Sequence, residues 1–324
     1  MNGPLLALDT PALYYRAFYA LPSSLRSPSG APIGAVRGLL DMLAGIIGRS
    51  DSARVVAAFD ADWRPAFRTG ILPEYKAARV RQDRSDGAET PDDLEPQVPL
   101  LRRALTLAGI PLLEQVGHEA DDVLGTLAAE ARQAERELIV VTGDRDLFAL
   151  VGGAVRVLYP GKQIAAARLV DDAVLAAEYG VPGGPAYREA AALRGDSSDG
   201  LSGVPGIGEK TAAQLIAAHG DLESVLAAAA RAARGESVPG LTPRRAALLT
   251  EHADLARRTL QVMTTVDDLP LGFDLATPLP AARDRQGLLA FAEQHGFGSA
   301  ATRLLAAQDD ALAATAGQGS GERP

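Results

Sequence analysis

Short apolar runs alternate with amphipathic stretches along the first half of the chain. The apolar runs have the length and composition of buried β-strands and lie at 4–9, 53–60, 137–144 and 155–159. Apolar residues recur at helical spacing in the stretches 36–49, 94–109 and 119–134. Such strand–helix–strand alternation is typical of a mainly parallel sheet with helices on both faces. We therefore expect an α/β domain over residues 1–180.

The pattern changes near residue 180, where alanine-rich helical segments separated by Gly and Pro replace the strand-like runs. This change predicts a second, all-helical domain over 181–305. The last residues, 306–324, end in the polar, glycine-rich sequence TAGQGSGERP, which is typical of a disordered tail. Inside the first domain, residues 80–91 are charged and show no periodicity, so we expect a loop there.

Three of the predicted strands end in an aspartate, namely Asp9, Asp60 and Asp144. Because ligands bind at the carboxyl ends of the strands of a parallel sheet, we expect these side chains to converge on one crevice. Six further carboxylates lie near strand ends, helix starts or turns and could share that site: Glu119, Asp121, Asp122, Asp146, Asp196 and Asp199.

Each of these acids also has an ordinary structural explanation. An Asp after a strand often caps the next helix, acids in a first helical turn complement the helix dipole, and the sequence DSSD at 196–199 fits a turn. Like charges at this density would nevertheless repel one another unless cations lay between them. Oxygen ligands without His or Cys favour Mg²⁺ or Mn²⁺. Two such ions about 4 Å apart can promote in-line attack of water on a phosphodiester.

The composition restricts the alternatives. The 324 residues include no cysteine and four histidines, so disulfides and thiolate metal sites are excluded. No apolar run is long enough to span a membrane, and the N-terminus reaches Asp9 too early for a secretory signal, so we expect a cytoplasmic protein. The formal net charge of −9 by itself argues against a nucleic-acid partner, since nucleic-acid-binding domains are usually basic.

Basic residues nevertheless gather in one segment. Six of them lie between Arg64 and Arg84, against two acidic residues. Phe67 and Tyr75 are interleaved with these cations, and an aromatic ring can stack on a nucleobase while Lys and Arg hold phosphates. The same pattern fits the solvated face of a helix, and the segment alone does not decide between the two.

A second candidate for phosphate binding lies at 186–219, where two predicted helices flank the sequence GVPGIGEKTA. Gly206 and Gly208 allow backbone N–H groups to approach a phosphate closely, and Lys210 adds a positive charge at the start of a helix. This pattern is typical of a helix-hairpin-helix, which holds a nucleic-acid backbone without reading bases. The alternative is an αα-corner that uses glycine for a sharp turn.

Six sequence blocks in order resemble the 5′-nuclease family, which comprises the 5′→3′ exonuclease domain of bacterial DNA polymerase I, its free-standing relatives and the flap endonucleases. The blocks are LDTPALYYRAFYALP, AAFDADWRPAFR, EYKAAR, GHEADDVLGTLA, VVTGDRDLFALV and LRGDSSDGLSGVPGIGEKTA. The resemblance covers about residues 4 to 300 and implies a PIN-like α/β nuclease domain with a helical arch at about 64–98, followed by a helix-hairpin-helix domain. The remaining residues are too few for a polymerase domain, so we expect a free-standing member.

The resemblance also implies roles for individual residues. The first metal cluster of the family matches Asp9, Asp60, Glu119, Asp121 and Asp122, and the second matches Asp144, Asp146, Asp196 and Asp199. The cations that stabilise the transition state match Lys76 and Arg79, and a basic residue near the scissile phosphate matches Arg16. Tyr75 falls where an aromatic residue stacks on the nucleotide. The part of the hairpin that grips duplex DNA and binds a potassium ion matches Gly206, Gly208, Lys210 and Thr211.

Two features depart from the family pattern. Gly200 replaces the asparagine that usually follows DSSD, and we expect it to loosen the turn that aims Asp199. Residues 80–90 are longer than the bacterial pattern and are expected in or beside the arch, through which a single-stranded 5′ end passes. Substrate preference is expected to depend on this second departure.

The sequence thus predicts a two-metal, Mg²⁺- or Mn²⁺-dependent 5′→3′ exonuclease and flap endonuclease that removes primers or flaps during DNA replication and repair. Its expected partner is DNA with a 5′ end or 5′ flap, including RNA-primed DNA, and we expect a monomer. Two alternatives are a DNA-binding relative with weakened catalysis and a PIN-type ribonuclease, which would not need the hairpin. A phosphatase of the haloacid-dehalogenase type would need Asp-x-Asp, and Pro11 stands at the second position.

Overall fold

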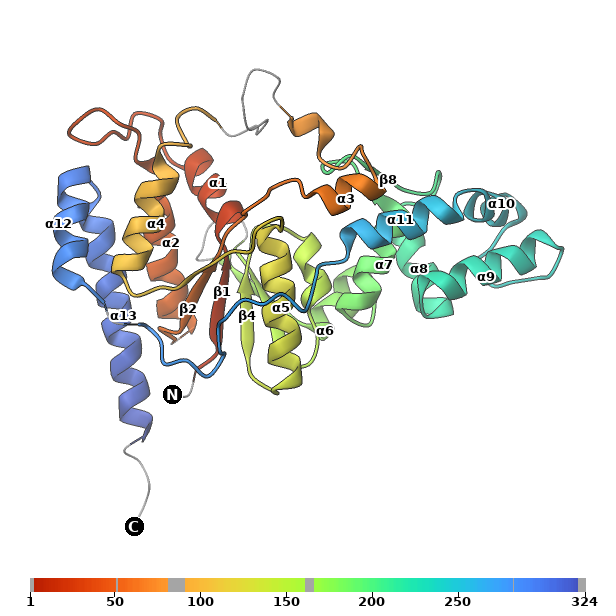
Figure 1. Cartoon of the computed structure of the whole chain (residues 1–324). Helices are drawn as coiled ribbons and strands as arrows, with labels where there is room; N and C mark the ends of the chain where they lie inside the picture. The colour runs from red at the N-terminus through yellow and green to blue at the C-terminus, as the bar shows by residue number, and fades with distance from the viewer. Residues whose placement is uncertain (1–2, 51, 81–90, 161–165, 282, 320–324) are drawn as a thin grey trace, which may run out of the picture.

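A six-stranded sheet lies at the centre of the first half of the molecule (Figure 1). The computed structural model describes residues 3–50, 52–80, 91–160, 166–281 and 283–319. The strands are β1 (Leu5–Asp9), β2 (Val55–Ala58), β3 (Leu112–Leu113), β4 (Leu138–Val141), β5 (Val155–Tyr159) and β6 (Arg168–Val170). They lie in the order β3-β2-β1-β4-β5-β6, and neighbours pair in parallel except for β5 and β6. The predicted, mainly parallel sheet is confirmed.

Helices cover both faces of this sheet, and its central strands β1, β2 and β4 are buried at every residue. One face packs against α5 (Ala120–Gln133). The opposite face packs against α2 (Gly34–Ser50) and α4 (Gln97–Leu107). Because both faces are covered, the strands read as continuous apolar runs instead of alternating apolar and polar residues.

Short helical segments complete this half of the molecule. They are α1 (Thr10–Ala20), α3 (Ala66–Ile71), the 3₁₀ turns η1 (Ala77–Arg79) and η2 (Asp146–Leu150), and α6 (Asp172–Val174), which continues into a π-helical turn, η4 (Leu175–Tyr179). The predicted arch at about 64–98 is described at its two ends only, because residues 81–90, and with them most of the predicted loop, lie outside the described residues. Within the described ranges, none of the helices has the length and apolarity needed to cross a bilayer.

The second half extends away from the sheet as a group of helices (Figure 1). These are α7 (Gly184–Arg194), α8 (Glu209–His219), α9 (Leu222–Ala233), α10 (Pro243–Glu251) and α11 (Ala253–Met263). Between α7 and α8 the chain forms a small antiparallel hairpin of β7 (Gly195–Asp196) and β8 (Leu201–Ser202). The hairpin is a local exception to the prediction of an all-helical second half.

The last two helices return to the sheet. α12 (Arg285–His295) packs against α4, and α13 (Gly298–Gly319) lies along α2 (Figure 1). Phe297, Leu304 and Leu305 are buried in the same core as α2. The predicted limit of the helical domain at residue 305 is therefore wrong, because these apolar residues complete the cover of the sheet. The predicted disorder of 306–324 is wrong as far as Gly319, and residues 320–324 lie outside the described residues.

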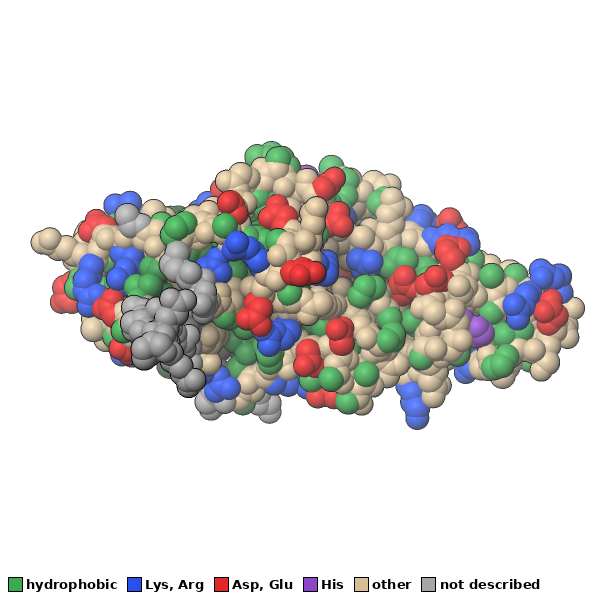
Figure 2. Space-filling model, turned by 90° about the horizontal axis from the view of Figure 1, so that it is seen from below, with side chains coloured by type: hydrophobic (Ala, Val, Ile, Leu, Met, Phe, Trp, Pro, Cys, Tyr) green, Lys and Arg blue, Asp and Glu red, His purple; other side chains and the backbone are tan. Residues whose placement is uncertain are grey.

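Charged side chains are interspersed on the face of the molecule seen from below. Figure 2 shows acidic and basic side chains mixed over this face, and neither kind forms a continuous patch there.

Candidate metal centre and DNA interface

The carboxyl edge of the sheet opens into a cleft of about 580 Å³. Asp9 is the last residue of β1, while Asp60 and Asp144 follow β2 and β4. Glu119 and Asp121 come from the start of α5. All five carboxylates line the cleft, so the parallel strand order brings together acids that lie far apart in the sequence.

The same side chains also serve the local structure. Oδ1 of Asp9 accepts the backbone N–H of Ala12 at 3.2 Å and caps α1, while its Oδ2 accepts the hydroxyl of Thr142 at 2.5 Å. Oδ1 of Asp60 accepts the backbone N–H of Ala120 at 2.8 Å, at the start of α5. Each of these carboxylates can therefore hold a helix start and still line the cleft, because Oδ1 accepts the backbone N–H group.

The electrostatics of the cleft favour a bound cation. Burial raises the pKa of Asp9 to about 7, and the charge of Asp144 adds to this shift. Burial likewise raises the pKa of Asp60 to about 6. The pKa of Asp121 is raised well above its usual range by burial and then by the charge of Asp9. A divalent cation would stabilise the charged form of each group, and a donor set made only of oxygens fits Mg²⁺ or Mn²⁺.

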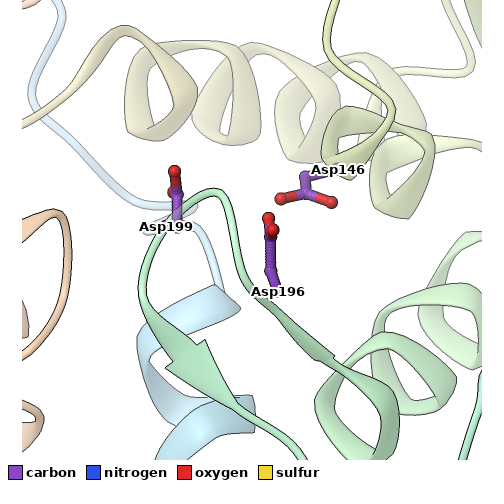
Figure 3. Close-up of side chains that lie close together, drawn as sticks. All are labelled: Asp146, Asp196 and Asp199. Carbon is purple, nitrogen blue, oxygen red and sulfur yellow. The ribbon is translucent and has the colours of Figure 1, made fainter. Parts of the chain in front are cut away.

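A second acidic cluster lies beside the first. Asp146 begins η2, Asp196 ends β7, and Asp199 lies in the β7–β8 turn. One carboxylate oxygen from each of the three lies within 4.8 Å of the others, and Figure 3 shows the three side chains gathered between their elements. Asp144 connects the two clusters, because its Oδ1 accepts the backbone N–H of Asp146 at 2.9 Å.

Burial and mutual repulsion also raise the pKa values of two carboxylates in this second cluster. Burial, followed by the charge of Asp144, raises the pKa of Asp146 to about 8. Burial alone would raise the pKa of Asp196, but hydrogen bonds from Asp146 and Ser198 lower it. Burial raises the pKa of Asp199 as well. The spacing and the all-oxygen donor set of these aspartates suit a divalent cation.

Two cations from one short turn reach both clusters. Lys76 is the N-cap of η1 and Arg79 is its last residue, and both line the cleft. The Lys76 ammonium pairs with Glu119 of the first cluster, and the Arg79 guanidinium pairs with Asp199 of the second.

Tyr75 does not lie where the resemblance implied. Its side chain is 5% exposed, and its hydroxyl donates to Glu119 at 3.0 Å. The predicted stacking of Tyr75 on a nucleotide is therefore wrong in this structure, because the ring is packed in the core beneath the cleft and serves to hold a carboxylate.

Asp122 is also placed differently from the prediction. It is fully buried, does not line the cleft, and binds both terminal nitrogens of Arg68, at 2.5 and 2.9 Å. In this arrangement Asp122 does not face the cleft as a metal ligand would, because its side chain folds back onto the start of α5 and accepts the N–H of Glu119 at 3.2 Å.

Arg16 lies on α1 but is not among the residues that line the cleft.

Sequence reasoning also missed several functional candidates. In the sequence Arg68 is one cation of a basic segment, whereas in the structure its side chain is 3% exposed. The cleft is further lined by aromatic residues from α1 and from the segment after β2, namely Tyr14, Tyr15, Tyr19 and Trp63. In the sequence, the tyrosines that follow Asp9 could have indicated that aromatic rings line the cleft.

The turn that carries Asp199 is tightly packed, contrary to expectation. Gly200 has φ of +71°, and a Cβ there would lie 2.6 Å from the carbonyl oxygen of Glu74. The carbonyl oxygen of Asp199 also accepts the N–H of Lys76 at 2.8 Å. Glycine at this position therefore permits close docking of the turn on the 74–76 backbone, and the expected loosening is wrong.

The predicted glycine turn of the helix-hairpin-helix lies between β8 and α8. Gly206 has φ of +77°, which glycine adopts easily, and Gly208 is the N-cap of α8. Buried Ile207 anchors the turn between them. Gly206, Gly208 and Lys210 are exposed, and Thr211 is partly buried. The start of α8 thus presents backbone N–H groups and one ammonium group to solvent, which suits an anionic backbone.

Comparison with known proteins gives matches along most of the chain. The family model described as 5′-3′ exonuclease, N-terminal resolvase-like domain, matches residues 4–180. The model described as 5′-3′ exonuclease, C-terminal SAM fold, matches residues 184–286. A 5′-3′ exonuclease of Streptomyces coelicolor is 44% identical over 306 residues, which cover 93% of this chain and 98% of the relative.

Solved structures share the fold at low sequence identity. The T5 D15 protein co-crystallised with metal ions has a TM-score of 0.58 at 17% identity, covering 94% of this chain and 99% of that one. The catalytic core of Rad2 in complex with a DNA substrate has a TM-score of 0.58 at 14% identity, covering 94% of this chain and 91% of that one. By the match of both family models and the near full-length relative, this chain belongs to the 5′-3′ exonuclease family.

Proposed function

We propose that this chain is a metal-dependent 5′→3′ exonuclease and flap endonuclease that hydrolyses DNA phosphodiesters in primer removal and repair. One observation carries the proposal, namely a carboxylate cluster that lines one cleft together with Lys76 and Arg79, with a second carboxylate cluster joined to it through Asp144. Membership of the 5′-3′ exonuclease family supports the reaction class.

The proposed cofactor is Mg²⁺ or Mn²⁺, with two or more ions bound. Asp9, Asp60, Glu119 and Asp121 would hold the first site, and Asp144, Asp146, Asp196 and Asp199 the second. Bound there, such ions supply an activated water and stabilise charge on the leaving oxygen. The carboxylates fix the ions because caps and hydrogen bonds already hold Asp9 and Asp60 in place.

The cations of the cleft act on the phosphate. Lys76 and Arg79, which line the cleft, are proposed to neutralise charge that develops on the scissile phosphate. A group of this kind typically contributes about 10²- to 10³-fold in rate. Arg16, on the same helix as the cleft-lining tyrosines, is proposed to hold the backbone near that phosphate. Gly206, Gly208, Lys210 and Thr211 are proposed to grip the duplex, with a potassium ion at the turn.

The proposed substrate is DNA with a 5′ end or a 5′ flap, including an RNA-primed end, bound by a monomer in the cytoplasm. The deciding assay uses a 5′-flap duplex with labelled ends, with Mg²⁺, with Mn²⁺ and with neither. We expect cleavage only with a divalent ion, and products that report both the exonucleolytic and the flap cut. A single-stranded RNA of equal length is expected to be cut far more slowly.

Two variants test the metal clusters directly. Asp60→Asn and Asp144→Asn are expected to nearly abolish cleavage while melting close to the parent temperature, because asparagine keeps the oxygen that caps α5 in the first case. Asp62→Asn is the matched control, since Asp62 lies two residues after Asp60 but does not line the cleft. Substantial Mg²⁺-dependent cleavage by either cleft variant would contradict the proposal.

The alternatives predict other outcomes of the same assay. A relative with weakened catalysis would bind the flap duplex without cutting it, even in Mn²⁺. A PIN-type ribonuclease would cut the RNA in preference and would be indifferent to changes at Lys210.

A further inference from the structure

Arg68 lies under the cleft and not on the surface of the basic segment. It belongs to α3, and its side chain is 3% exposed. One terminal nitrogen donates to Oε2 of Glu119 at 2.6 Å and to Asp122 at 2.9 Å, and the other donates to Asp122 at 2.5 Å. Nε donates to the carbonyl oxygen of Val262 at 2.9 Å. Such a buried guanidinium is held for structure and cannot contact DNA in this arrangement.

Asp122 is saturated by its partners. Oδ1 accepts from Arg68 and from the backbone N–H of Val266 at 2.9 Å, and Oδ2 accepts from Arg68 and from the backbone N–H of Glu119 at 3.2 Å. A carboxylate accepts about four hydrogen bonds, so these partners use the acceptor sites of Asp122. Unlike Glu119, Asp122 also does not line the cleft. With Lys76 on Glu119, the two cations and two anions of this group balance. Buried charges persist only when they are paired and hydrogen-bonded in this way.

The Arg68–Asp122 ion pair joins three separate parts of the chain. Arg68 comes from α3 at the base of the arch region, and Asp122 comes from the start of α5, next to the cleft. The strap, defined here as residues 264–269, follows α11 and crosses α5 (Figure 1). It is pressed onto that helix, because a Cβ at Gly125 would lie 2.5 Å from Oγ1 of Thr265. The N–H of Leu269 also donates to Thr126 at 3.2 Å.

Glu119 is therefore fixed through partners outside the cleft. Arg68 binds Oε2, Tyr75 donates to both oxygens at 3.0 Å, and Lys76 pairs with Oε1 at the cleft. The orientation of this carboxylate depends on Arg68, and the position of Arg68 depends on Asp122 and on the end of α11. Thus the metal site and the helical half of the molecule share one junction.

We propose that Arg68 is a positioning residue that, together with Asp122, fixes Glu119 as a metal ligand and couples its orientation to the end of α11. The proposal rests on the proposed function for the identity of the metal site. Arginine is required because its planar fork serves Glu119, Asp122 and a carbonyl group together, whereas a lysine ammonium cannot reach all three with the same geometry.

The test is Arg68→Lys in the full chain, with Mn²⁺ binding measured by calorimetry in the absence of DNA. Partners behind metal ligands typically contribute about 10- to 100-fold in metal affinity, and we expect a loss of this size. Repeating the titration in an Asp199→Asn background removes the second cluster from the signal. Arg303→Lys is the matched control, because Arg303 pairs with Asp41 on α2, far from the cleft, and its change should leave Mn²⁺ affinity unaltered.

Cleavage kinetics separate positioning from DNA contact. For Arg68→Lys we expect kcat to fall at limiting Mn²⁺, KM for the flap duplex to stay near the parent value, and added Mn²⁺ to restore much of the rate. Unchanged Mn²⁺ affinity would overturn the proposal, as would a rise in KM with kcat intact, which would identify Arg68 as a DNA contact. If Arg68→Lys does not fold, Asp122→Asn takes its place, with the same expected and contrary results. Because metal binding is measured without DNA, absence of cleavage in the parent protein would sink the proposed function alone.

Discussion

At the scale of single residues, the site is built from side chains with two tasks. Asp9 and Asp60 cap helices and also line the cleft, and Glu119 begins α5 while facing Lys76. This explains why their positions look structurally ordinary in the sequence. The cap fixes the backbone position of the acid, and burial then makes its charged form dependent on a cation.

Lys76→Ala is expected to lower turnover far more than DNA binding. Removing a cation that neutralises the transition state typically costs about 10²- to 10³-fold in rate. Single-turnover cleavage of a flap duplex gives the rate, and titration of the same duplex in Ca²⁺ gives the affinity. An equal fall in both quantities would show that Lys76 only docks the substrate.

Gly200→Ala is expected to displace the turn that carries Asp199. The new Cβ would lie 2.6 Å from the carbonyl oxygen of Glu74, in addition to the strain of φ at +71°. Gly272→Ala is the matched control, since its φ is +61° and a Cβ added there would have nothing within 4 Å. We expect a loss of stability of about 1 kcal/mol in both from the positive φ alone, and a loss of Mn²⁺-dependent cleavage only in Gly200→Ala. Thermal melts and cleavage rates decide, and normal cleavage by Gly200→Ala would show that close docking is not needed.

At the scale of elements, short turns carry the chemistry and longer helices hold them. The η1 turn brings Lys76 and Arg79 to different acidic clusters, and the β7–β8 turn brings Asp199 back beside Asp146. The start of α8 lies on the same connection, beyond β8. The acids and the glycines Gly206 and Gly208 are thus neighbours in sequence because one connection between α7 and α8 carries both Asp196 and Asp199 and the turn before α8.

Lys210→Ala should weaken duplex binding for all sequences alike. Its ammonium is exposed at the start of α8, where it would contact one phosphate. Loss of one such contact reduces the slope of log affinity against log salt by about one. Affinity is measured over a range of salt concentrations for the parent protein and for Lys210→Ala. An unchanged affinity and slope for Lys210→Ala would remove the hairpin from the DNA interface.

At the scale of the whole molecule, the cleft concentrates negative charge that folding alone does not compensate. The sheet brings the acids together, and Asp9 and Glu119 are buried there. α12 and α13 complete one of these faces, although they follow the helical domain in sequence. The fold therefore stores electrostatic repulsion at the place where a divalent ion would bind.

The metal-free protein is accordingly expected to lose stability as the pH rises. A carboxyl group whose pKa is raised by folding stabilises the folded state below its unfolded pKa, and this contribution is lost as the pH rises through its folded pKa. Asp60, Asp9 and Asp146, with pKa values of about 6, 7 and 8, place the loss between about pH 4 and about pH 8. Melting temperatures in EDTA should fall over this window, and Mn²⁺ should restore them by an amount that grows with pH. A melting temperature in EDTA that rises with pH, with no added effect of Mn²⁺, would contradict this.

The sequence by itself determined four of the six strands of the sheet and placed an aspartate at or just after the end of three of them. Apolar runs identified β1, β2 and β4, because a strand buried on both faces is apolar throughout. The mainly apolar run VRVLY identified β5, which is buried at three of its five residues. The aspartates at strand ends indicated a crevice, because parallel strands have their carboxyl ends on one edge. The glycine pattern before α8 indicated a tight turn, because glycine readily adopts a positive φ, as Gly206 does in the structure.

Only the tertiary structure decided which of the chemically similar residues face the cleft. Lys76 and Arg68 are both cations of one segment, yet the first lines the cleft and the second is buried under it. Glu119 and Asp122 are both acids of one helix start, yet only Glu119 lines the cleft. The sequence pattern likewise did not indicate that α13 returns to pack on α2. In each case the local sequence permits either placement, and packing between elements distant in the chain selects one.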